Sequence, residues 1–158
     1  IRSWDLNEVT QQTNLFGHQG AITSILFTSQ NETIISSSAD GSIKIWDFLS
    51  KKEEGSLRGH SAEITSLALS ADDEHLISGS LDKTAKVWSL KHMAEVTNLT
   101  GHSAAVTAVL FLGAGLQAAT GSKDATVRIW NSKTGSSLFT LTGHKSQVND
   151  IVATVDNS

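Results

Sequence analysis

The sequence contains no cysteine and no proline. Without cysteine, the chain can form neither disulfide bonds nor thiolate metal sites. Without proline, its turns must rely on glycine, asparagine, aspartate and serine. Long apolar runs are also lacking, since none approaches the ~20 residues that a membrane-spanning helix needs. We therefore expect no insertion into a membrane.

An excess of basic charge is absent as well. Lysine and arginine total 12 against 16 aspartates and glutamates, so the formal net charge is -4. A surface for nucleic acid needs a basic face, and we expect no nucleic-acid binding here. The longest run of charges, residues 51–54, holds two lysines and two glutamates and predicts a solvated turn.

Internal repeats organise this chain of 158 residues, which is long enough for one domain with a hydrophobic core. Gly-His pairs recur every 42 residues, at 17–18, 59–60, 101–102 and 143–144. The same interval separates Trp4, Trp46, Trp88 and Trp130, and also Asp40, Asp82 and Asp124. An interval that is kept without insertion or deletion indicates that each repeat is one structural unit.

Each repeat contains short segments that are typical of β-strands. The first is apolar and β-branched, which predicts a strand buried on both faces. The third alternates apolar residues with lysine or arginine and ends at the tryptophan, which predicts a strand with one wetter side. The first segments lie at 22–27, 64–69 and 106–111, the second at 34–38, 76–80 and 118–122, and the third at 43–46, 85–88 and 127–130. A fourth, such as 137–141, leads into the next Gly-His pair.

Four short antiparallel strands in about 42 residues are typical of a propeller blade. The Gly-His pairs, the aspartate turns and the Trp46-Asp47 ending resemble those of the WD-repeat β-propeller family, over essentially the whole chain. The resemblance implies an all-β fold of four-stranded antiparallel blades. Complete repeats are expected at about 17–58, 59–100 and 101–142, with partial repeats at 1–16 and 143–158.

The two partial repeats do not complete each other. Trp4 has no matching histidine upstream, and His144 has no matching tryptophan downstream. Two copies joined head to tail would lack an inner strand at each junction, which would leave buried backbone groups unpaired. We therefore expect an incomplete ring, whose remaining blades come from the same longer polypeptide or from another chain. Such rings typically have about 4–8 blades.

In the WD-repeat family, a chain of four hydrogen-bonded side chains pins each blade. Carried over by position, the structural tetrads are His18, Ser36, Asp40 and Trp46; His60, Ser78, Asp82 and Trp88; and His102, Thr120, Asp124 and Trp130. The residue types suit this role, because a buried indole N–H needs an acceptor, which a hydroxyl provides while donating onward to histidine. The other histidine nitrogen then donates to the carboxylate, so that every buried donor has a partner.

Serine, histidine and aspartate are also the components of a hydrolase triad. Here the set occurs three times at constant spacing, and the Gly-x-Ser-x-Gly turn of serine hydrolases does not occur in the sequence. We therefore expect no catalytic residue and no enzyme activity in this chain. His75 and His92 lie in predicted turns without a nearby ligand pattern, so we expect no metal site and no cofactor.

Partner contacts in the family often come from residues three and five positions after the histidine and one before the aspartate. The candidate partner-binding residues are therefore Ala21, Thr23, Ala39, Glu63, Thr65, Leu81, Ala105, Thr107, Lys123, Gln147 and Asn149. The set is small, nearly uncharged and without an arginine cluster, which disfavours recognition of phosphorylated peptides. The alternative for each position is an ordinary exposed loop residue.

Three classes of function follow from the resemblance. The first is a protein–protein interaction scaffold that binds proteins or peptides through its loops and faces, as part of a larger ring or multiprotein complex. The second is a propeller module of a larger enzyme or regulator whose catalytic domain lies outside this chain. The third is a nucleic-acid-associated propeller, which the negative charge disfavours. Two N-glycosylation sequons occur, at 31–33 and 98–100, but nothing else in the sequence points to secretion and we interpret them as chance matches. We expect an intracellular protein, cytoplasmic or nuclear.

Overall fold

The computed structural model describes residues 1–5, 10–113 and 117–154. Within these residues the chain forms 14 β-strands and no helix, so none of the described segments is a helix that could cross a membrane. The strands are β1 (Arg2–Asp5), β2 (Thr10–Asn14), β3 (Ile22–Phe27), β4 (Thr33–Ser38), β5 (Ser42–Asp47), β6 (Glu53–Arg58), β7 (Ile64–Leu69), β8 (His75–Ser80), β9 (Ala85–Ser89), β10 (Ala94–Leu99), β11 (Val106–Leu112), β12 (Gln117–Ser122), β13 (Val127–Asn131) and β14 (Ser137–Leu141).

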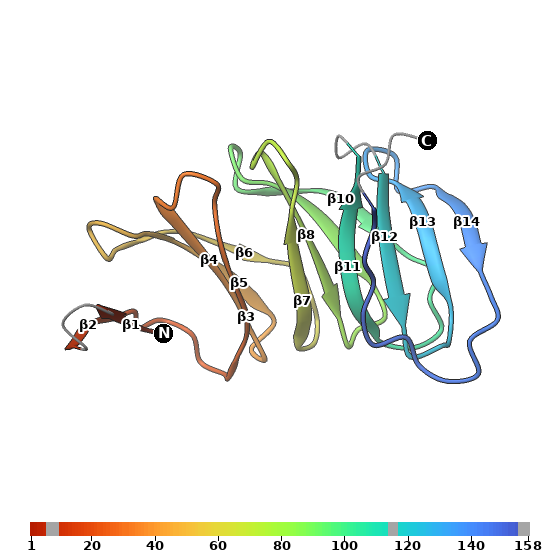
Figure 1. Ribbon diagram of the computed structural model, residues 1–158, viewed down its shortest axis with the longest axis horizontal. Helices are drawn as coiled ribbons and strands as arrows, with labels where there is room; N and C mark the ends of the chain where they lie inside the picture. The colour runs from red at the N-terminus through yellow and green to blue at the C-terminus, as the bar shows by residue number, and fades with distance from the viewer. Residues whose placement is uncertain (6–9, 114–116, 155–158) are drawn as a thin grey trace.

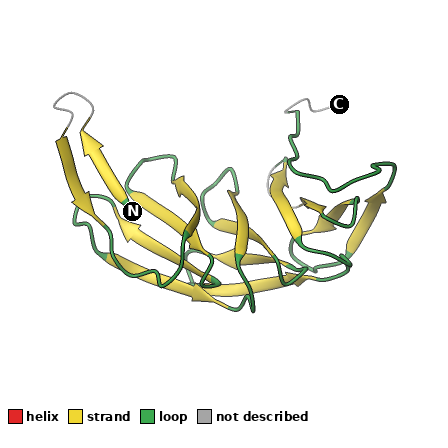
Figure 2. Cartoon of the chain, turned by 90° about the horizontal axis from the view of Figure 1, so that it is seen from below, coloured by secondary structure: helices red, strands yellow, loops and turns green. Residues whose placement is uncertain are grey.

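The strands form three four-stranded antiparallel sheets in which each strand pairs with the next one along the chain. We call β3–β6 the first blade, β7–β10 the second blade and β11–β14 the third blade. A separate pair, β1 and β2, precedes them. The blades stand side by side in chain order (Figure 1) along an open arc that does not close into a ring (Figure 2). The prediction of propeller blades is confirmed.

The turn between the second and third strands of each blade has the same backbone in all three repeats. The residue after the aspartate has a positive φ each time, 77° at Gly41, 73° at Lys83 and 66° at Ala125. Only glycine adopts this conformation without strain. At Lys83 and Ala125 the aspartate offsets the strain, because its Oδ1 accepts the backbone N–H two residues on, as at Thr84 (2.9 Å).

Most of the core lies between the blades. One layer joins side chains of the first and second blades, namely Ile35, Ile43, Ile45, Leu57, Ile64, Leu67, Leu76 and Trp88. The next layer joins the second and third blades through Ile77, Ala85, Val87, Leu99, Val106, Val109, Ala118 and Trp130. Apolar area removed from water in this way stabilises each blade against its neighbour.

Burial on both faces was expected for every inner strand, and for β3 this expectation is wrong. Ile25 and Phe27 on β3 are 44% and 46% exposed, because no complete blade precedes the first one among the described residues. The third blade is similarly open on its other side, where Phe139 and Leu141 of β14 are 64% and 53% exposed. The first and third blades therefore each expose apolar side chains on one face, although Ile1 and Leu15 pack against Ile34 and Trp46 of the first blade.

Candidate functional site

A hydrogen-bonded tetrad ties together each blade, and the second blade shows it most clearly. The Trp88 Nε1–H donates to Ser78 Oγ (2.8 Å), and that hydroxyl lies 2.8 Å from His60 Nε2. His60 Nδ1 lies 2.8 Å from Asp82 Oδ2. Every donor in this chain of hydrogen bonds has an acceptor when the neutral imidazole carries its hydrogen on Nδ1. That N–H then donates a hydrogen bond to the carboxylate, and Nε2 accepts one from the hydroxyl.

The first and third blades repeat this arrangement. In the first, the histidine lies 2.9 Å from the hydroxyl and 3.2 Å from the carboxylate, and in the third both distances are 2.7 Å. The indole N–H donates to the hydroxyl over 2.9 and 2.8 Å. The members, in order, are His18, Ser36, Asp40 and Trp46, and then His102, Thr120, Asp124 and Trp130.

Each tetrad has two further members that the sequence reasoning missed. A hydroxyl two residues after the aspartate donates to Oδ1, as Thr84 does to Asp82 over 2.7 Å. The backbone N–H after the histidine donates to Oδ2, as at Ser61 (3.1 Å). Ser42 and Thr126 occupy the hydroxyl position in the other blades. The recurrence of serine or threonine there, also every 42 residues, was a signal that could have found them.

These hydrogen bonds hold the aspartates ionised. Burial by itself raises the pKa of Asp82, but hydrogen bonds from Thr84 and His60 outweigh it, so that the pKa lies below its ordinary value. The pKa values of Asp40 and Asp124 are lowered in the same way. Burial lowers the pKa of His60, although the Asp82 carboxylate opposes this shift. In the second blade, a neutral His60 beside an anionic Asp82 is therefore the stable form near pH 7.

The tetrads are not arranged for nucleophilic catalysis. The Ser36, Ser78 and Thr120 side chains are 0% exposed, so no substrate carbonyl can reach their hydroxyls. Each hydroxyl also accepts an indole N–H, which engages one of its two lone pairs and makes the oxygen less nucleophilic. The arrangement acts as a structural clasp between the loop before the inner strand and the turn after the second strand.

The clasp positions the loops that carry the candidate partner-binding residues. The backbone N–H before each aspartate donates to the carbonyl three residues after the histidine: Ala39 to Ala21 (2.8 Å), Leu81 to Glu63 (2.9 Å) and Lys123 to Ala105 (2.9 Å). Glu63 and Ala105 are half-buried. The exposed members of the candidate set are Ala21, Ala39, Leu81, Lys123, Gln147 and Asn149.

The three threonines of the candidate set are engaged within the structure. Thr65 Oγ1 donates to the Val106 carbonyl of the next blade over 2.7 Å. Thr107 Oγ1 donates in the same way to the Val148 carbonyl, and Thr23 Oγ1 lies 2.9 Å from Ser37 Oγ. All three hydroxyls are engaged within the chain, and of the three it is Thr65 that links two blades, so the threonines would contribute to a partner site through its shape.

The lysines of the third strands are buried, which corrects two expectations. Lys44 and Lys86 are only 6% and 7% exposed and do not lie on a wetter side. Lys44 Nζ lies 2.5 Å from a carboxylate oxygen of Glu53, and Lys86 Nζ lies 2.8 Å from one of Glu95. Glu53 belongs to the run 51–54, so the second half of that run is a paired strand rather than a solvated turn.

His75 is not in a turn, because β8 begins there. Its ligand atoms and those of Asp72 and Glu74 lie within 4.8 Å of one another, contrary to the expectation that no ligand pattern is nearby. Asp72 is already engaged, since its Oδ1 accepts Ser70 Oγ–H (2.5 Å) and the Glu74 N–H (3.0 Å). The carboxylate therefore closes the turn before β8.

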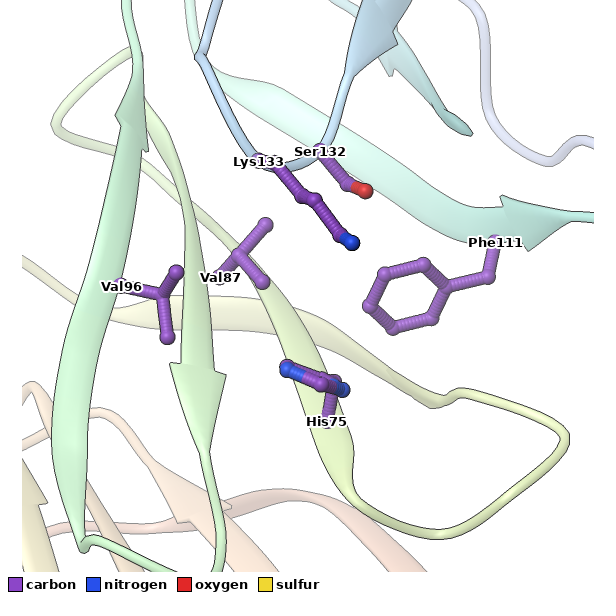
Figure 3. A pocket seen from close by; sticks show the side chains of 6 residues that line it. All are labelled: His75, Val87, Val96, Phe111, Ser132 and Lys133. Carbon is purple, nitrogen blue, oxygen red and sulfur yellow. The ribbon is translucent and has the colours of Figure 1, made fainter. Parts of the chain in front are cut away.

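A small pocket lies beside His75, between the second and third blades (Figure 3). Its lining comprises His75, Val87, Val96, Phe111, Ser132 and Lys133. The cavity measures about 30 Å³, whereas sites for organic ligands measure about 300–1,000 Å³. It therefore has room for water and not for a substrate or cofactor.

Four-stranded antiparallel sheets set side by side, each clasped by a histidine, a hydroxyl, an aspartate and a tryptophan, define a β-propeller of the WD-repeat class. The chain belongs to the WD40 family (WD domain, G-beta repeat), whose model matches residues 9–47, 51–89 and 93–131. Each matched segment begins near an outer strand, at β2, β6 or β10. Its boundaries therefore differ from those of the repeats expected above, which were counted from the Gly-His pairs. Members of this family are generally non-catalytic scaffolds for protein–protein interaction.

The chain is also similar to two solved structures, "Structure of U3-55K" and "Crystal structure of RRP9 WD40 repeats". Each is 30% identical to it with a TM-score of 0.81, and each similarity covers 86% of this chain and 43% of that chain. The chain thus spans less than half the length of these structures. No sequence in the curated set of proteins matches it.

Proposed function

We propose that this chain is a protein–protein interaction scaffold that binds proteins or peptides through the loops beside its aspartate turns. The observation that carries the proposal is the geometry of those loops. Each blade places an exposed residue before the aspartate, at Ala39, Leu81 and Lys123, and clasps it by the tetrad and by a backbone hydrogen bond. Pre-ordered loops lose little conformational entropy on binding.

The same chain takes part in a larger ring or multiprotein complex. Its two open apolar faces support this, because exposed apolar area of that kind favours association. Ile25 and Phe27 lie on one face, and Phe139 and Leu141 lie on the other. Further blades, from the same longer polypeptide or from another chain, would cover them as the second blade covers its neighbours. We place the protein inside the cell, in the cytoplasm or nucleus.

Two alternatives are weaker. A propeller module within a larger enzyme or regulator would leave the same loops for binding, and the sequence of the parent protein would identify it. A role on nucleic acid is disfavoured by the net charge of -4. Binding to nucleic acid that weakens steeply with salt would support that alternative instead.

The test is capture of partners by the purified protein, followed by identification of the bound proteins by mass spectrometry. Charge reversals at two candidate positions, Glu63→Lys and Lys123→Glu, should reduce recovery of specific partners by about tenfold, since a rim charge facing a partner costs affinity when reversed. Lys52→Glu is the matched control. Lys52 is exposed and precedes β6, at the end of β5 opposite to the aspartate turn.

The outcomes separate the possibilities. Loss of a partner with Lys123→Glu and retention with Lys52→Glu supports binding through the aspartate-turn loops. The reverse result would move the site to the opposite face of the propeller. Failure to recover any partner that survives washing, with all three proteins folded by circular dichroism, would contradict the scaffold function itself.

A further inference from the structure

The third blade lacks an ion pair that the other two blades contain. In the first and second blades, a buried lysine two residues before the tryptophan pairs with a glutamate on the outer strand, Lys44 with Glu53 and Lys86 with Glu95. In the third blade the cation is Arg128. Among the described residues it has no ion pair, and its buried Nε has no hydrogen-bond partner.

The missing partner can be located from the strand register. Glu53 lies opposite Trp46, and Glu95 lies opposite Trp88. The corresponding residue of the third blade is Ser137, which lies opposite Trp130 and is exposed. A serine hydroxyl is too short to take the place of a glutamate carboxylate, so the cation keeps its position without a counter-charge from the part of the chain that the structure describes.

The guanidinium is nevertheless held in place. Its Cζ lies 5.8 Å from the centre of the Trp130 ring, as Lys44 Nζ lies 5.8 Å from the Trp46 ring. Its Nη1 lies 3.0 Å from the point where a side chain on Gly101 would begin. Arg128 is half-buried, so part of its side chain remains open to solvent. A fixed cation with an unmatched buried donor is a site that favours an anion.

We propose that Arg128 binds a carboxylate from an aspartate or glutamate of a partner protein, at the place that Glu53 and Glu95 fill in the other blades. This inference rests on the proposed scaffold function and names one feature of the partner, an acidic side chain. Arginine is suited to the role, because its planar guanidinium binds a carboxylate with two parallel hydrogen bonds. The neighbouring Leu138 and Phe139 are 40% and 64% exposed and offer apolar contact beside the charge.

The blades themselves indicate carboxylate rather than phosphate. The two occupied sites each hold one carboxylate against one cation, and no further cation contacts either pair among the described residues. A phosphate carries a charge of about -2 and is usually bound by several basic groups. Arg128 offers one.

The experiment is an NMR titration that observes the arginine Nε–H signals of the 15N-labelled protein. The chain has three arginines, Arg2, Arg58 and Arg128, so the spectrum is simple. The probe is a short peptide with glutamates spaced by glycine and serine, compared with the same peptide carrying glutamine and with one carrying phosphoserine. We expect a saturable shift at Arg128 with the glutamate peptide, and none at the exposed Arg58.

Two neighbouring serines supply the matched variants. Ser137→Glu should place a carboxylate on Arg128, shift its Nε–H signal before any peptide is added, and weaken peptide binding by about tenfold. Ser136→Glu adds the same charge one residue away, just before β14, and should leave peptide binding at Arg128 unchanged. Both substitutions are at exposed positions, so the fold should be retained.

Equal shifts at Arg58 and Arg128, or equal effects of the two serine variants, would overturn the proposal, because both indicate general attraction between charges. A preference for the phosphoserine peptide would overturn the assignment of a carboxylate. If the unchanged protein captures partners and the Arg128→Gln variant captures the same ones equally well, the arginine site is wrong and the scaffold function stands.

Discussion

The second and third blades share one skeleton and differ in what covers them. Both contain a complete tetrad with closely similar distances. Leu99, at the end of β10, is 1% exposed, whereas Leu141, its counterpart on β14, is 53% exposed. The comparison teaches that the tetrad is a property of a single blade, while burial of the outer strand depends on the blade that follows.

The largest difference is expected for the leucines themselves. Leu99→Ala should lower the free energy of unfolding by about 3 kcal/mol, because it creates a cavity between two blades. Leu141→Ala should lower it by less than about 0.5 kcal/mol, because the side chain is already half in water. Urea denaturation monitored by tryptophan fluorescence measures both values. Equal losses would mean that the third blade is covered in solution, for example by another blade.

Loss of the tetrad hydroxyl should affect the two blades alike. Ser78→Ala and Thr120→Val each leave a buried indole N–H without an acceptor and a histidine nitrogen without a donor. We expect each to lower the free energy of unfolding by about 2 kcal/mol. The same denaturation measurement applies. If only the second blade responded, the tetrad would depend on its neighbours and the comparison would fail.

Acid should destabilise the blades in two steps. The pKa of His60 is lower in the folded protein, so the unfolded chain binds more protons below about pH 6.5 and stability decreases as the pH falls past that value. The pKa values of Asp40, Asp82 and Asp124 are also lowered, so a further loss begins below about pH 4. Thermal unfolding from pH 7.5 to 3 measures both steps. His60→Gln should remove the first step, and an unchanged profile would contradict the role of this histidine.

The smallest effect concerns the buried lysines. Glu95→Ser gives the second blade the outer-strand residue of the third, and it leaves Lys86 without its carboxylate. We expect a loss of about 1 kcal/mol, since the glutamate side chain is 35% exposed and the pair is partly screened by solvent. Glu54→Ser is the control, because Glu54 is exposed. A comparable loss in the control would show that the effect is not specific to the pair.

The fold could be predicted because the features that define it are local and repeated. A constant interval of 42 residues and apolar segments of strand length identify the blades. Strand β14 was predicted with its observed bounds, Ser137–Leu141. The tetrads followed from the resemblance to WD repeats, since histidine, hydroxyl, aspartate and tryptophan keep fixed spacings within each repeat.

What could not be predicted depends on contacts between strands or between blades. Lys44 was expected on a wetter side because its own strand alternates, but Glu53, nine residues later on β6, allows it to be buried. The exposure of Ile25 depends on what precedes the first blade, which the composition of β3 cannot show. The use of the Thr65 hydroxyl depends on a carbonyl 41 residues away.

The bond from Thr65 to the Val106 carbonyl joins equivalent places in adjacent blades, and its counterpart from Thr107 to Val148 is separated by the same 41 residues. The joint between the first and second blades differs, because Thr23 Oγ1 lies 2.9 Å from Ser37 Oγ of its own blade. Where the bond recurs, after the second blade and after the third, removing the repeat in between would bring together two surfaces that already match. Removing half a repeat would leave a tetrad histidine without its hydroxyl, aspartate and tryptophan partners. Evolution can therefore lengthen or shorten such an assembly by whole repeats and keep this bond at the new joint.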